Sequence, residues 1–94
     1  LDLSTFNTSK VNDMRYMFYN CSTLTTIYVS EYNETTDTGW TTKSVTNSTN
    51  MFNFCRDLVG GIGTTYNSSI LDATYARIDK AGEPGYFTNI TDKQ

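Results

Sequence analysis

The chain has 94 residues, a hydrophobic fraction of 37% and a formal net charge of −3, values that fit one small folded domain with a thin core. Thr, Ser and Asn make up more than a third of the residues, yet aromatic residues reach 14% and there is a single proline, which argues against disorder. The seven basic residues are scattered singly among ten acidic ones, so the composition excludes a nucleic-acid backbone as partner. No apolar run approaches the roughly 20 residues of a membrane span.

A repeat organises the sequence. Residues 11–24, VNDMRYMFYNCSTL, return as residues 45–58, VTNSTNMFNFCRDL. The apolar pairs at matching positions are Val11 and Val45, Met17 and Met51, Phe18 and Phe52, Cys21 and Cys55, and Leu24 and Leu58. Steps of three and four residues predict an α-helix with one apolar face in each copy, and Asn12 and Thr46 are suitable N-caps. Because Met14 becomes Ser48, we expect the second helix to be the weaker one.

Short alternating stretches precede and follow the first copy. Leu1 to Ser4 alternates apolar and polar residues, and Ile27 to Ser30 does the same one period later. A third stretch in the same register, Gly61 to Thr64, has glycine at the inward positions. A strand followed by a helix and another strand makes successive strands parallel. The period predicts an α/β solenoid, a leucine-rich-repeat-like stack of short parallel strands and short helices.

The predicted organisation has two parts. Residues 1–64 form the solenoid, with two repeats and a terminal rung, and residues 65–94 form a capping segment. Within the cap, residues 75–79 and 85–88 read as two strands of a β-hairpin around a turn at residues 80–84. We also expect the solenoid edge at Leu1 and Leu3 to be exposed and to allow self-association.

The second unit is longer than the first, because the step from Val11 to Val45 exceeds the step from Leu1 to Ile27. The excess predicts an insertion at residues 31–43. Asp37-Thr38-Gly39 is a turn signal that predicts a hairpin ending near Trp40. Trp40, the single tryptophan, either anchors a ligand or folds back over the flank of the repeat. The predicted candidate ligand contacts are Tyr32, Trp40, Glu31, Glu34 and Asp37.

Residues that could support catalysis, a metal or a cofactor are missing from the sequence pattern. There is no His, and the two cysteines are too far apart for any usual zinc spacing, so we expect no metal and no cofactor. Cys21 and Cys55 are either small buried residues or a disulfide between the copies. Asp37-Thr38-Gly39 has the letters of an aspartic protease motif, but Asn33 to Thr36 before it is not a buried apolar strand. Without an assembled acid or base, we expect the chain not to be an enzyme.

The residues described above carry a family resemblance. Residues 1–27 and the stretch MFNFCRDLVGG resemble the leucine-rich repeats of BspA-like bacterial surface proteins, including a group of unknown function in mycoplasma, listerial and gut-bacterial surface proteins. The M-F-x-x-C-x-x-L core of that family falls on residues 17–24 and 51–58, and the tail from Gly60 to Thr88 is similar to the segment that closes such arrays.

The resemblance implies a location and a function. It implies an extracellular module, secreted or on a bacterial cell surface, that recognises a host or bacterial surface protein or glycan without catalysis. A purely structural stalk or cap that positions other domains of a longer parent chain is the alternative. An exposed aromatic insertion favours recognition, whereas a buried Trp40 favours the structural alternative.

Overall fold

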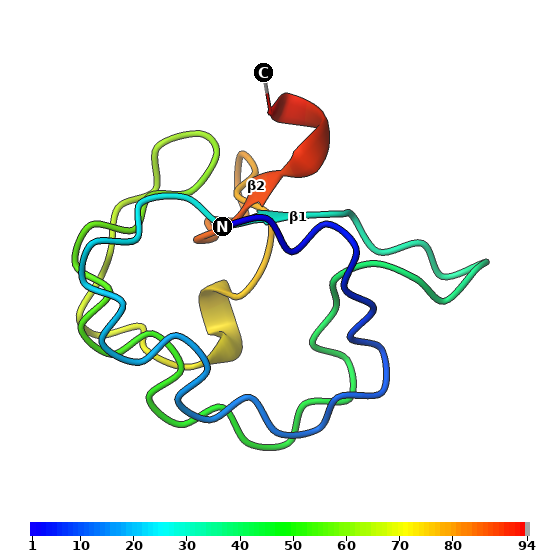
Figure 1. Ribbon diagram of the computed structural model, residues 1–94, viewed down its shortest axis with the longest axis horizontal. Coiled ribbons are helices and arrows are strands. Elements are labelled where there is room, and N and C mark those ends of the chain that lie inside the picture. Colours follow the sequence, from blue (N-terminus) through cyan, green and yellow to red (C-terminus); the bar gives the residue numbers. More distant parts are fainter. Residues whose placement is uncertain (94) are drawn as a thin grey trace.

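The two copies of the repeat lie side by side. The computed structural model describes residues 1–93, and in Figure 1 the blue-to-cyan and green segments follow each other over one half of the molecule. Alternate amides of the first copy donate to carbonyl oxygens of the second at 2.8 to 3.1 Å, and Asp13 and Asn47 form a parallel bridge. The four pairs are Met14 to Asn47, Tyr16 to Thr49, Phe18 to Met51 and Asn20 to Asn53.

Neither copy is an α-helix, so the predicted helices from Asn12 and Thr46 are wrong. The chain instead makes a series of tight turns in which an amide donates to the carbonyl three residues before it, as Met17 does to Met14 and Cys21 to Phe18. Left-handed backbone interrupts these turns at equivalent places in the two copies, at Tyr16, Asn20, Asn50 and Phe54. One such residue ends an α-helical run, because an L residue in this conformation cannot continue the right-handed ladder.

Regular secondary structure is short throughout residues 1–93. The elements are β1 (Tyr28–Val29), the 3₁₀ helix η1 (Ala73–Tyr75), β2 (Thr88–Asn89) and the 3₁₀ helix η2 (Ile90–Asp92). The two strands pair in parallel, with Tyr28 opposite Thr88, inside a small body with a radius of gyration of 12.2 Å. With almost no helix and two two-residue strands, the described chain is not a stack of strand-and-helix repeats, and the predicted α/β solenoid is wrong.

The strand order also differs from the prediction on one side of β1. On the other side the parallel pairing is confirmed, because Asp2 bridges Tyr28 and the Leu3 amide donates to the Tyr28 carbonyl at 2.8 Å. The place expected for residues 61–64 belongs to β2, and Gly61 only donates to the Phe87 carbonyl at 3.3 Å.

The C-terminal segment is not a simple β-hairpin. Lys80 and Glu83 exchange two backbone hydrogen bonds of 3.1 and 2.9 Å, so the predicted turn is present. Beyond the turn the chain bends again, and Ile78 pairs with Phe87 in parallel. Gly85 permits this bend, because a Cβ there would lie 2.1 Å from the Arg77 carbonyl oxygen. The cap predicted as two antiparallel strands is therefore wrong.

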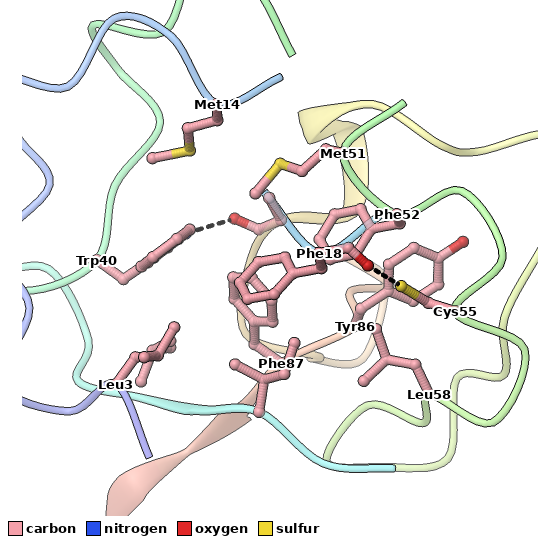
Figure 2. Close-up of a cluster of buried hydrophobic side chains, with 13 residues drawn as sticks. Leu3, Met14, Phe18, Trp40, Met51, Phe52, Cys55, Leu58, Tyr86 and Phe87 are labelled. Atoms are coloured by element: carbon pink, nitrogen blue, oxygen red, sulfur yellow. Dashed lines mark hydrogen bonds between the residues drawn. The ribbon is translucent and has the colours of Figure 1, made fainter. Parts of the chain in front are cut away.

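One hydrophobic core joins the repeat, the insertion and the C-terminal segment (Figure 2). Phe18 and Phe52 are stacked with ring centroids 5.5 Å apart and planes at 15°, which confirms that they are core anchors. Tyr86 and Phe87, both fully buried, meet the Phe52 ring edge to face. The buried hydrophobic residues are Leu3, Met14, Phe18, Ile27, Val29, Trp40, Met51, Phe52, Cys55, Leu58, Ala76, Tyr86 and Phe87.

Both cysteines are free. The Cys55 thiol is buried and donates to the Phe18 carbonyl oxygen at 2.9 Å, and burial raises its pKa to about 11. Cys21 is half-buried. Of the two alternatives, the structure therefore shows separate packing residues, and Cys55 also joins the copies by a hydrogen bond.

Candidate functional site

The insertion at residues 31–43 reverses the chain as predicted, but it is a hairpin only at its tip, because Glu31 and Trp40 at its base pair in parallel. Asn33 and Thr38 exchange backbone hydrogen bonds of 2.8 and 3.3 Å, and the Asn33 side chain accepts from two amides at the tip. Asp37 and Gly39 have positive φ angles of 54° and 100°. A Cβ on Gly39 would lie 2.5 Å from the Glu31 carbonyl oxygen, so the turn needs glycine at this position.

Trp40 ends the hairpin and points into the core. Its side chain is 6% exposed, its ring meets Phe87 edge to face at 4.9 Å, and its Nε1 donates to the Ala76 carbonyl oxygen at 2.8 Å (Figure 2). Of the two alternatives for this residue, the structure shows the one in which it folds back. Trp40 thus fixes the insertion against the C-terminal segment.

A groove of about 290 Å³ lies between these two segments. Glu31 and Lys80 stand on opposite walls and form an ion pair with a 2.8 Å separation. The hydrogen bond to Glu31 raises the pKa of Lys80. Both side chains remain about half exposed, so the pair is open to exchange with an outside partner. The principal lining residues are Glu31, Tyr32, Trp40, Arg77, Lys80 and Glu83.

Tyr32 and Asp37 face each other within the insertion. The Tyr32 hydroxyl donates to Asp37 Oδ1 at 2.6 Å, and the Lys43 ammonium donates to the same two groups at 2.7 and 3.2 Å. The Tyr32 hydrogen bond, followed by Lys43, lowers the pKa of Asp37. The Lys43 nitrogen also lies 5.0 Å from the centre of the Tyr32 ring. These contacts hold the Tyr32 side chain at the groove wall.

The structure brings only some of the predicted contacts together. Glu31, Tyr32 and the edge of Trp40 line the groove, Asp37 supports Tyr32 from behind, and Glu34 is exposed at the hairpin tip. The C-terminal wall, with Arg77, Lys80 and Glu83, was not predicted as part of a site. Its only sequence signal was the charge on both sides of the predicted turn at residues 80–84.

A buried carboxylate fixes that wall, and sequence reasoning missed it. Asp79 is 4% exposed and accepts hydrogen bonds from the Ile62 and Thr64 amides, the Thr64 hydroxyl and the Gly85 amide at 2.7 to 3.1 Å. Burial alone would raise the pKa of Asp79, but the hydrogen bonds outweigh it and the pKa lies below its ordinary value. A Cβ on Gly60 would lie 2.6 Å from an Asp79 oxygen, which explains the glycine there.

The groove offers recognition chemistry from charged, hydroxyl and aromatic groups. Among residues 1–93, no group of three His, Cys, Asp or Glu side chains could hold a metal ion. No helix in that part of the chain is both long and apolar enough to cross a membrane.

Comparison with known proteins adds a family. Neither the curated proteins nor the solved structures contain a match to the chain. A family model described as "Mycoplasma protein of unknown function, DUF285" matches residues 1–81, which include both copies of the repeat, the insertion and most of the groove. The chain therefore belongs to the DUF285 family.

Proposed function

We propose that the chain is a non-catalytic recognition or adhesion module of a bacterial surface or secreted protein, and that the groove beside the insertion is its contact surface. The resemblance of the repeat core to BspA-like surface proteins supports the location, and membership of the DUF285 family supports a bacterial source. The partner class is a protein or glycan on a host or bacterial surface.

The observation that carries this proposal is the position of the insertion. Residues added beyond the repeat are fixed against the C-terminal segment by Trp40 and leave a groove with both signs of charge on its walls. Preformed walls lower the entropy that a partner must lose on binding. Glu31 and Lys80 can exchange their mutual ion pair for contacts with a charged partner.

The size of the groove sets the expected affinity. At about 290 Å³ it lies at the lower end of ligand pockets and admits a protruding side chain or a single sugar rather than a large ligand. So few contacts give weak binding at one module, which many copies on a cell surface would strengthen.

A structural role as a stalk or cap is the second candidate, and the burial of Trp40 favours it. The one tryptophan of the insertion has its ring and its N–H inside the molecule, where it joins two segments. In that case the groove is only the seam between them.

Binding to immobilised extracellular-matrix proteins and to a glycan array separates the two candidates. Tyr32→Ala and Lys80→Glu change opposite walls of the groove, and Phe54→Ala, which removes an exposed aromatic ring outside it, is the matched control. We expect each groove variant to weaken binding at least about fivefold, a loss of about 1 kcal/mol of binding free energy, and the control variant to bind like the parent. Binding that is equal in all three variants would remove the groove from the function.

A further inference from the structure

The first copy of the repeat has an open edge. Among residues 1–93, no donor reaches the carbonyl oxygens of Asp13, Arg15 and Met17, and that of Tyr19 has only a 4.0 Å contact from the Cys21 thiol. We call these four oxygens the open edge. Such rows of unpaired backbone groups are the usual templates for strand addition.

The second copy shows what this edge is shaped to accept. The equivalent oxygens of the second copy, on Asn47, Thr49, Met51 and Asn53, each accept an amide hydrogen from the first copy. Both copies have positive φ at the equivalent pairs Tyr16 and Asn50, and Asn20 and Phe54. Since the backbones match, the open edge directs its oxygens outward as the second copy directs its own toward the first.

Apolar side chains along the open edge are more exposed than their counterparts in the second copy. Leu1 is 54% exposed where its counterpart Ile27 is fully buried, and Met17 is 38% exposed where Met51 is fully buried. Val11 is exposed and Val45 is half-buried. The first copy buries Met51 by lying beside it, and nothing within residues 1–93 does the same for Met17.

We propose that the open edge binds a polypeptide segment that donates backbone N–H groups at every second residue and places apolar side chains on Leu1, Val11 and Met17. The segment that meets both conditions is a further copy of the turns of residues 11–24. Its four donors would be the equivalents of Met14, Tyr16, Phe18 and Asn20, the donors that the first copy presents to the second.

Hydrogen-bond polarity excludes a second, identical chain as the full occupant. A two-fold dimer through this edge would place acceptors against acceptors. A head-to-tail dimer would need four amides of the second copy, those of Ser48, Asn50, Phe52 and Phe54. Two of them are already used, because the Phe52 amide donates to the Leu71 carbonyl at 3.0 Å and the Phe54 amide donates to the Tyr66 hydroxyl at 3.2 Å. A second, identical chain could therefore make at most two of the four hydrogen bonds at the open edge, whereas a further copy of residues 11–24 could make all four. The sequence predicted an exposed edge at Leu1 and Leu3, but Leu3 is buried in the core and only Leu1 is exposed. Self-association there would lack these hydrogen bonds.

The test adds such a segment to the chain. Residues 1–26 are duplicated in front of Leu1, which preserves the step from Leu1 to Ile27, and a control carries the same segment in scrambled order. We expect the added equivalents of Met14, Tyr16, Phe18 and Asn20 to exchange amide hydrogen at least about tenfold more slowly than in the scrambled control. The carbonyl ¹³C resonances of Asp13, Arg15 and Met17 should shift as well.

Two results would overturn the proposal. One is protection no greater than in the scrambled control, because the added segment is then not held at the edge. The other is a two-fold dimer of the original chain that Met17→Lys abolishes and that leaves the Asp13, Arg15 and Met17 carbonyl resonances unshifted. Ile62→Lys, at a more exposed apolar residue outside the edge, is the control for that variant. The groove is not used, so this test and the test of the proposed function fail independently.

Discussion

The two copies of the repeat share a backbone but not an environment. The second copy has fewer apolar residues, yet Met51, Phe52, Cys55 and Leu58 are all fully buried, whereas in the first copy Met17 is exposed and Cys21 and Leu24 are half-buried. The second copy lies between the first copy and the C-terminal segment, and the first copy has a neighbour on one side only within residues 1–93. We infer that the number of neighbours, rather than local composition, decides how much of each copy is buried. The expectation of a weaker second helix does not apply, because neither copy is a helix.

The largest test of this comparison is the matched pair Phe52→Ala and Phe18→Ala. Phe52 contacts the rings of Phe18, Tyr86 and Phe87, whereas Phe18 contacts only two rings. Removing a buried Phe costs about 3 to 5 kcal/mol, and we expect Phe52→Ala near the upper value and Phe18→Ala near the lower one. Urea unfolding measures both. An equal cost, or a larger one for Phe18, would contradict the comparison.

The next test weakens the C-terminal segment, which is the second neighbour of the second copy. Asp79→Asn replaces a charged acceptor of four hydrogen bonds by an amide whose NH₂ group faces two donors, and we expect a loss of about 3 kcal/mol. Hydrogen exchange should rise at the Phe52 amide, which is bonded to Leu71. Asp57→Asn, at an exposed position of the second copy, is the control and should unfold at the parent midpoint.

The same carboxylate predicts a pH dependence. Because the pKa of Asp79 is lower in the folded chain than its ordinary value of 3.8, its stabilisation is fully present above that value and is lost as the pH falls through the folded pKa. Unfolding free energy should therefore fall as the pH drops below that ordinary value in the parent, and less steeply in Asp79→Asn. Parallel curves for the two proteins would show that Asp79 does not contribute to acid unfolding.

The rates at which the two cysteines react with a thiol reagent compare the opening of the two copies. Cys55 is buried, with its pKa raised to about 11, while Cys21 is half-buried. A thiol reagent should modify Cys21 in the folded protein and Cys55 only on opening of the structure, at least about a hundredfold more slowly at neutral pH. Comparison of Cys21→Ala with Cys55→Ala assigns the two rates, and similar rates would mean that both copies open equally.

Recurrence in the sequence was sufficient to predict the pairing of the copies but not their local conformation. Phe18 and Phe52 stack because equivalent positions face each other whatever the backbone between them. The helix predicted from steps of three and four residues is wrong, since a series of tight turns returns Met14 and Phe18 to the same side of the chain just as a helix does. The positive φ at Tyr16 and Phe54 has no signal in the residue type.

The candidate site shows the same division. Asp37-Thr38-Gly39 predicted the reversal of the chain in the insertion because turns depend on local residues, but it did not predict the parallel pairing of Glu31 with Trp40. Glu31 and Tyr32 were predicted to line a site from their place beside this reversal. The direction of Trp40 and the opposite wall at Lys80 depend on a C-terminal fold with an unexpected second bend. Asp79 was not identified because three of its four hydrogen-bond donors are backbone amides. Every residue except proline has such an amide, so the residue types give no signal of which amides bond to Asp79.

The smallest expected change in stability is that of Met17→Ala, and it is compared with the same substitution at the equivalent residue of the second copy, Met51. Met51 is fully buried, so Met51→Ala should cost about 2 to 5 kcal/mol. Met17 is 38% exposed on the open edge, so Met17→Ala should change the free energy of unfolding by less than about 0.5 kcal/mol. In the chain with residues 1–26 duplicated, the original Met17 acquires the neighbour that Met51 already has, and its substitution should then become costly. If Met17→Ala is as harmless there as in the original chain, then a neighbour at the open edge does not bury this residue, and the difference between the two copies has another cause.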